Sequence, residues 1–247
     1  MKKQTRISIV LGLSLLVAGG AGVATATQTQ QIQDVLQVEA VKPVAKNDLT
    51  EAAIAGVRKA DKPTAEKITN LQKSKTWVGH KKAAYFELPN FGKKNDVKSA
   101  QDADDLSKSG TYTQTYAITK PKIFITDTKI DANSKITSSM NQNVMSLAQQ
   151  TLGNVPALTD LNQKQINKNM VIVTGYSDAE DKQQGTVKEF ISFIFMRDAH
   201  GHMHMISIES EQDAESVAKN IATASTLGNS LTVEKPSGVA FKKNVEK

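Results

Sequence analysis

Phe190-Ile191-Ser192-Phe193-Ile194-Phe195-Met196 is the stretch of this 247-residue chain that decides its fold. Six of these seven residues are apolar, and a short run rich in aromatic and β-branched residues predicts a buried strand. The turn residues Asp198-Ala199-His200-Gly201 follow after Arg197, and residues 202–208 then predict the returning strand. The fold is therefore expected to be built around an antiparallel hairpin.

The residues on either side of this hairpin extend the pattern. Residues 170–176 predict another buried strand, joined to the hairpin by a polar turn at 178–185. After the hairpin, Ser210-x-x-Asp213 is a capping pattern, apolar residues recur at helical spacing over 217–224, and Gly228 is a stop signal. Hairpins followed by a helix are typical of the α+β class, so we predict an antiparallel sheet with helices packed on one face.

Upstream, the pattern predicts further short elements. A helix is expected to start at Ser138 or Ser139 and to stop at Gly153, because apolar residues recur at helical spacing between them. We expect a loop or weak helix at 97–108 and a connection at 154–169. Strands are predicted at 83–88, 111–119 and 122–130.

The stretch 27–76 differs from the rest of the chain in composition. All twelve aromatic residues (one Trp, four Tyr and seven Phe) lie between Trp77 and Phe241. Asp48-x-x-Glu51 and Pro63-Thr64 are nevertheless helix-start signals. Two interpretations stay open: a spacer with transient helices, or a helical arm that packs on the domain or on a partner.

The first residues have the three parts of a cleavable secretory signal peptide. Residues 1–6 are basic, residues 7–18 are apolar, and Ala24-Thr25-Ala26 is a small-x-small cleavage pattern. A membrane anchor is the alternative, but the apolar run turns into Gly19-Gly20 before reaching the roughly 20 residues that a span needs. We expect cleavage after Ala26 and a secreted, extracytoplasmic protein without a transmembrane span in its mature part.

We expect the chain to consist of four parts. They are a signal peptide at 1–26, a polar or helical arm or spacer at 27–76, an α+β domain at 77–231 and a basic tail at 232–247. Because the chain contains no cysteine, lipid anchoring at the cleavage point, disulfides and thiolate chemistry are excluded.

The net charge and the small number of arginines limit the classes of partner that we expect. The formal net charge of +6 falls to +3 when Lys2, Lys3 and Arg6 leave with the leader, and only Arg58 and Arg197 then remain as arginines. Specific recognition of phosphates and bases depends on the arginine fork, so we expect no nucleic-acid partner. The lysines predict a solvated surface with, at most, weak association with anionic surfaces.

Three of the four histidines fall in one hexapeptide, which is the candidate metal site of the chain. On a strand, alternate side chains share a face, so His202 and His204 can reach one metal ion, and His200 at the turn can supply a third ligand. Imidazole suits zinc or copper(II), and thioether neighbours suit copper(I). The predicted ligands are His200, His202, His204, Met203 and Met205. The alternative is that the histidines lie on a solvent-facing side of the strand near the turn.

The sequence contains none of the common catalytic motifs. The sequence has no Gly-x-Ser-x-Gly elbow, no His-Glu-x-x-His and no phosphate-binding glycine loop. The acidic clusters 102–105 and 178–181 lack the spacing of calcium loops, and His80 is isolated. We therefore predict no catalytic or cofactor-binding residues. A hydrolase whose carboxylates come from distant positions is kept as an alternative.

The order of elements over residues 170–228 resembles the carboxy-terminal half of PsbP-like domains. The resemblance rests on the succession of strand, polar turn, long apolar strand, Gly201 turn, strand and closing helix. It implies an accessory role and no particular site. The expected function is a secreted, non-enzymatic binding or accessory protein whose partner is an unknown protein or a cell-envelope polymer, with a copper- or zinc-binding protein as the alternative.

Overall fold

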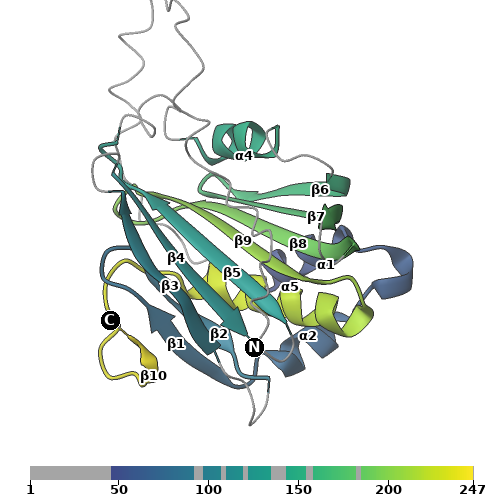
Figure 1. Cartoon of the computed structure of the whole chain (residues 1–247), viewed down its shortest axis with the longest axis horizontal. Helices are drawn as coiled ribbons and strands as arrows, with labels where there is room; N and C mark the ends of the chain where they lie inside the picture. Colours follow the sequence, from purple (N-terminus) through teal and green to yellow (C-terminus); the bar gives the residue numbers. More distant parts are fainter. Residues whose placement is uncertain are drawn as a thin grey trace, which may run out of the picture.

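The computed structural model describes residues 46–91, 97–106, 110–118, 122–134, 143–153, 158–181 and 185–246. Most strands form one seven-stranded antiparallel sheet, listed here in spatial order: β3 (Val97–Leu106), β4 (Thr111–Ile118), β5 (Ile123–Ile130), β9 (Met203–Glu211), β8 (Gly185–Arg197), β7 (Met170–Asp181) and β6 (Leu158–Asn167) (Figure 1). A second sheet has the order β10 (Phe241–Glu246), β1 (Lys75–Gly79) and β2 (Tyr85–Pro89). Together with the helices, these sheets confirm the predicted α+β class.

The β8–β9 hairpin lies near the middle of the large sheet. Successive side chains of β8 enter two different hydrophobic clusters: Phe190 and Ile194 face one, and Ile191 and Phe193 face the other. A strand buried on both faces needs apolar residues at every position instead of at alternate ones. This requirement explains why the 190–196 run is continuously apolar.

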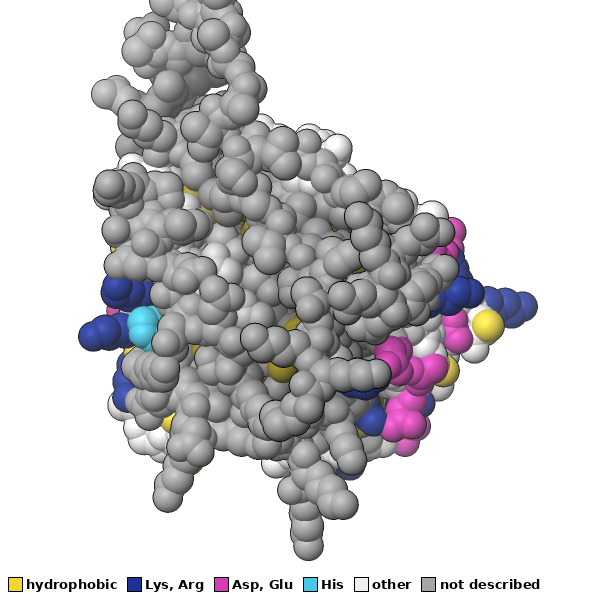
Figure 2. Space-filling model, in the orientation of Figure 1, with side chains coloured by type: hydrophobic (Ala, Val, Ile, Leu, Met, Phe, Trp, Pro, Cys, Tyr) yellow, Lys and Arg dark blue, Asp and Glu magenta, His cyan; other side chains and the backbone are white. Residues whose placement is uncertain are grey.

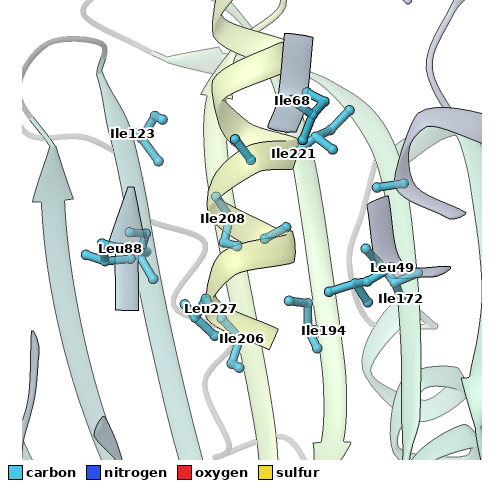
Figure 3. Packing of buried hydrophobic residues seen from close by; sticks show 14 of the residues in the cluster. Leu49, Ile68, Leu88, Ile123, Ile172, Ile194, Ile206, Ile208, Ile221 and Leu227 are labelled. Carbon is cyan, nitrogen blue, oxygen red and sulfur yellow. The ribbon is translucent and has the colours of Figure 1, made fainter. Parts of the chain in front are cut away.

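The larger cluster is covered by helices α1 (Lys46–Ala55), α2 (Ala65–Leu71) and α5 (Ala214–Ser230) (Figure 3). The smaller cluster, on the opposite face, is covered by α4 (Val144–Leu152), whose Val144, Leu147 and Ala148 are buried there. The predicted placement of the helices on one face thus holds for α1, α2 and α5. Helix α4 lies on the other face, because β7 and β8 are apolar on both sides.

Helices α1 and α2 belong to the same core as the large sheet. Leu49 of α1 and Ile68 of α2 are fully buried, and the hydroxyl groups of Thr50 and Ser225 lie 2.7 Å apart. Gly228 of α5 lets α5 and α1 approach closely, because a Cβ at this position would lie 2.7 Å from Leu49 Cδ2 of α1. Of the two interpretations of 27–76, packing on the domain therefore describes residues 46–71. Residues 27–45 and the predicted signal peptide at 1–26 lie outside the described residues.

Four strands form where the sequence predicted none. Residues 75–79 form β1 across the expected boundary at 76/77, residues 97–106 form β3, residues 158–167 form β6, and residues 241–246 of the expected tail form β10. Strands β3 and β6 are the two edges of the large sheet, where a strand has only one neighbour. Most β6 side chains are exposed, so the strand is polar and lacks the alternation that predicts strands. The expected turn at 178–185 is shorter, because β7 runs to Asp181 and β8 begins at Gly185.

The expected start of α4 at Ser138 or Ser139 lies outside the described residues, and the helix begins at Val144 with Asn143 as its cap. The helix ends at Leu152 before Gly153, as predicted. Within the part of the chain that the structure describes, no helix is long and apolar enough to cross a membrane.

Candidate functional site

The three clustered histidines lie at the turn between β8 and β9 and at the start of β9. Their side chains differ in exposure: 50% for His200, 24% for His202 and 0% for His204. Asp198 organises this turn by accepting backbone N–H bonds from His200 (2.8 Å) and His202 (2.9 Å) on its Oδ1. Gly201 has φ +83°, a conformation that favours glycine. The turn therefore brings each histidine to a different depth.

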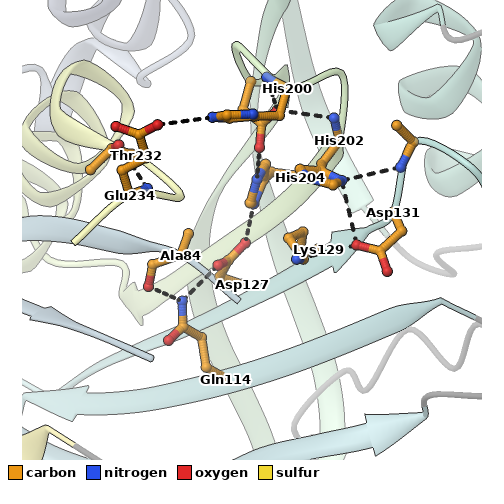
Figure 4. Close-up of polar contacts among 12 residues, drawn as sticks. Ala84, Gln114, Asp127, Lys129, Asp131, His200, His202, His204, Thr232 and Glu234 are labelled. Atoms are coloured by element: carbon orange, nitrogen blue, oxygen red, sulfur yellow. Dashed lines mark hydrogen bonds and ion pairs between the residues drawn. The ribbon is translucent and has the colours of Figure 1, made fainter. Parts of the chain in front are cut away.

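His204 lies between two carboxylates in the interior (Figure 4). Its Nδ1 is 3.0 Å from Asp127 Oδ1 of β5, and its Nε2 is 3.2 Å from Asp198 Oδ2. The side chains of His204 and Asp127 are 0% exposed, and that of Asp198 is 4% exposed. Both ring nitrogens can donate to ionised carboxylate oxygens at the same time only when the imidazole is doubly protonated.

The electrostatics of this triad favour its charged form. Burial opposes a charge on His204, but the attraction and hydrogen bonds of Asp127 and Asp198 outweigh it and raise the pKa of His204 to about 9. Burial likewise favours the neutral form of Asp198, yet the hydrogen bond and charge of His204 keep its pKa below the ordinary value. The protonated form of His204 is therefore favoured at neutral pH, and we call Asp127, His204 and Asp198 the Asp–His–Asp triad.

A buried amide extends the triad toward β4 and β2. Gln114 Nε2 donates to Asp127 Oδ2 (2.8 Å) and to the backbone oxygen of Ala84 (3.0 Å), while Tyr116 Oη donates to Gln114 Oε1 (2.8 Å). Burial raises the pKa of the Tyr116 phenol, so this group stays a neutral donor. The network thereby connects the large sheet with the segment that enters the small sheet.

The two outer histidines contact different segments. His202 Nδ1 accepts the backbone N–H of Ala132 (3.1 Å) and lies 3.4 Å from Asp131 Oδ1. Burial, together with the nearby charges of Lys129 and His204, lowers the pKa of His202. His200 lies 3.5 Å from a carboxylate oxygen of Glu234, and its ring stacks on that of His202 with the centroids 6.2 Å apart.

The five predicted metal ligands do not converge on one point. Met203 and Met205 face the cluster under α4, on the opposite side of the sheet from His204. Both nitrogens of His204 already face carboxylates. Among the described residues no group of three or more His, Asp or Glu side chains is arranged to hold a metal ion. Metal binding by this hexapeptide stays a prediction, and the observed arrangement does not favour it.

The triad lacks the features of a general base. An imidazolium with both N–H groups donated has no lone pair for accepting a substrate proton. The closed, buried arrangement suits a structural ion cluster that joins β5, β9 and the turn. The other residues that the sequence singled out lie away from the triad. His80 Nδ1 accepts the backbone N–H of Lys82, and Asp178 Oδ1 accepts a hydrogen bond from the side-chain amide of Gln212. The side chains of residues 102–105 are not among those that the structure describes.

The sequence pattern identifies the clustered histidines but not the carboxylates that bind His204. Asp127 follows Ile123 and Ile125 at the alternation of a predicted strand, on the face that enters the larger cluster. A carboxylate at such a position is a sign of a buried partner. Asp198 was assigned only a turn role, although its carboxylate also reaches His204.

Comparison of the chain with protein-family models, curated proteins and solved structures gives no match. The resemblance to PsbP-like domains stays an expectation from element order. Function must therefore be argued from the site and the sequence.

Proposed function

We propose that the protein is an exported, non-catalytic binding or accessory module that acts outside the cytoplasm on a protein or a cell-envelope polymer. The observation that carries this proposal is the closed state of the Asp127–His204–Asp198 triad. This cluster of ionisable groups presents no reactive atom at the surface, because the side chains of His204 and Asp127 are 0% exposed and that of Asp198 is 4% exposed. The leader at residues 1–26 supports export.

The charge distribution supports a partner other than nucleic acid. On the face in Figure 2, the described basic side chains lie in separate places, and some are beside acidic ones. Among the described residues, ion pairs also join Arg58 to Asp160 (2.7 Å) and Lys75 to Glu87 (3.1 Å). Mixed charge of this kind favours solubility over attraction to a polyanion.

Export is tested by expressing the full chain in an exporting bacterial host. We expect the mature protein in the medium or cell wall, with Thr27 as its first residue on N-terminal sequencing. The control carries Ala24→Leu and Ala26→Leu, which removes the small residues that signal peptidase requires and should leave the precursor uncut. Retention of the wild-type precursor in the cytoplasm would contradict export.

The non-catalytic role is tested on the purified mature protein. Co-sedimentation with purified cell walls measures binding to envelope polymer, and release of soluble sugars or peptides from the same walls measures hydrolysis. We expect no turnover. Sustained turnover that scales with protein concentration would overturn the proposal and favour the hydrolase alternative.

A further inference from the structure

Three aromatic residues of the small sheet, which we call the aromatic patch, pack on one another outside both hydrophobic clusters. The ring centroids of Trp77 and Phe241 are 6.4 Å apart, and those of Tyr85 and Phe241 are 5.7 Å apart. None of these three residues belongs to the clusters on the two sides of the large sheet. Core packing therefore does not explain why the only tryptophan of the chain lies here.

The aromatic patch lies on the outer face of the small sheet. On β1 and β2, Val78 and Phe86 point into the larger cluster. Because side chains alternate along a strand, Trp77 on β1 and Tyr85 on β2 point the opposite way. Phe241 is the partner of Trp77 in the parallel pairing of β10 with β1. Tyr85 is only 6% exposed and supports the patch, whereas Trp77 and Phe241 are partly exposed.

Charged side chains border the aromatic patch. Glu87 lies opposite Trp77 on β2, and its Oε2 is 3.1 Å from Lys75 Nζ. The side chains of Lys75 and Glu87 are 32% and 24% exposed. Lys235 Nζ lies 5.1 Å from the centroid of the Phe241 ring. Apolar rings, a hydrogen-bond acceptor and two hydrogen-bond donors are thus close together on the small sheet.

We propose that the aromatic patch is the binding surface for an uncharged, β-linked polysaccharide, an inference that rests on the proposed function and names its ligand class. In a β-linked chain of glucose-type sugars, C–H bonds form the faces of each ring and hydroxyl groups surround its edge. The C–H bonds carry a small positive charge and pack on the negative face of an aromatic ring. The hydroxyl groups donate to the Glu87 carboxylate and accept from the Lys75 ammonium group.

The size and charge of the patch favour a sugar over a protein or an anionic polymer. A stable protein interface buries about 800 Å² on each partner. In the described part of the chain the exposed large hydrophobic residues are Leu161 and Val239, and the rings of the patch are only partly exposed, so its apolar area is small. Glu87 neutralises Lys75, so this border does not attract a polyanion.

The single tryptophan provides a direct test. The purified mature protein is titrated with the β-linked hexasaccharides of glucose and of N-acetylglucosamine while its tryptophan fluorescence is recorded. Because Trp77 is the only tryptophan, any change in this emission reports on the patch. A bound sugar excludes water from the ring, so we expect the emission to shift to shorter wavelength and its quenching by acrylamide to decrease.

Variants identify the residues that bind the sugar. Trp77→Ala should weaken the affinity, measured by isothermal titration, by about tenfold or more, as is usual for a central aromatic contact. Trp77→Phe keeps an aromatic ring and should retain most of the affinity. Glu87→Gln should weaken it less, because a neutral amide accepts a weaker hydrogen bond than a carboxylate.

The matched control is Tyr112→Ala, which should leave the affinity unchanged. Tyr112 is also partly exposed, and Lys129 Nζ lies 4.9 Å from the centroid of its ring. It is on β4 of the large sheet and does not belong to the aromatic patch. An equal loss of affinity in Tyr112→Ala and Trp77→Ala would contradict the assignment of the sugar to the patch.

Two further results would overturn the inference. One is that neither hexasaccharide binds, and the other is that a hexasaccharide binds without changing the emission or the acrylamide quenching of Trp77. The quenching experiment on the wild type keeps the test decisive if Trp77→Ala fails to fold.

Cell-wall co-sedimentation separates this inference from the proposed function. Equal binding of wild type and folded Trp77→Ala to cell walls would overturn the sugar surface and leave the binding role intact. Turnover of a hexasaccharide whose binding changes the Trp77 emission would overturn the non-catalytic role and support the sugar surface.

Discussion

Single residues in the β8–β9 hairpin show how position decides ionisation. His200, His202 and His204 are separated by one residue each, yet one is exposed, one has a lowered pKa and one is a buried cation. Burial lowers the pKa of both inner histidines, but His204 has a carboxylate oxygen hydrogen-bonded at each ring nitrogen, whereas His202 Nδ1 accepts the Ala132 N–H and has Asp131 Oδ1 only at 3.4 Å. The same residue type therefore has three different environments within five positions.

The Asp–His–Asp triad predicts a loss of stability at alkaline pH. The pKa of His204 is about 9 in the folded state against 6.5 for an ordinary histidine, so its contribution is complete below pH 6.5 and disappears as the pH rises through 9. The shift corresponds to a decrease on the order of 3 kcal/mol in the free energy of unfolding. Urea unfolding at the two ends of this range measures it. The exposed-site control, His200→Gln, should keep the same decrease, and equal stability of the wild type at both ends would contradict the triad.

Metal titration tests the predicted ligand set. We expect zinc and copper to bind weakly and the affinity to be the same in wild type and in Met203→Leu, because Met203 lies on the opposite face from His204. Isothermal titration of the untagged mature protein, with elemental analysis of the purified sample, provides the measurement. One tightly held equivalent that disappears in the His202→Ala/His204→Ala variant would establish the metal-binding alternative.

At the scale of elements, the α1–α5 contact is a specific test of the amino-terminal helices. Leu49→Ala should lower the free energy of unfolding by about 2–5 kcal/mol, because it removes a fully buried side chain between α1 and α5. The matched control is Glu51→Ala on an exposed position of the same helix, expected to change stability by less than about 0.5 kcal/mol. Chemical denaturation measures both. Equal stability of the two variants would show that α1 is not part of the core.

Elements with strong apolar patterns could be predicted from sequence, whereas polar edge elements could not. The continuous apolar run 190–196 predicts a strand buried on both faces, and the helical spacing of apolar residues predicts helix α5. Strands β3 and β6 are held by backbone pairing with one neighbour each, and such pairing leaves no mark on side-chain periodicity. The His204 partner Asp127 was missed for a related reason: it is 77 residues away, and only the pairing of β5 with β9 brings the two together.

At the scale of the whole molecule, the last strand completes the small sheet. Strand β10 pairs in parallel with β1, and Phe241 packs 6.4 Å from Trp77 and 5.7 Å from Tyr85, measured between ring centroids. Removing residues 241–247 should therefore expose Trp77, the only tryptophan of the chain. We expect its fluorescence emission to shift to longer wavelength, with a smaller shift in Phe241→Ala, which keeps the backbone pairing. Unchanged emission after truncation would contradict the β10–β1 pairing.

The contact between α1 and α5 has a consequence for the order in which the chain folds. Thr50 meets Ser225 across 175 positions, and β1 meets β10 across a similar separation. A chain emerging from its amino-terminal end cannot bury Leu49 or complete the small sheet until its final residues have been made. Contacts of such large sequence separation slow folding. Helix α1 and strand β1 thus stay without their final packing partners until the carboxy-terminal residues have been synthesised, whereas the hairpins between sequence-adjacent strands have no such requirement.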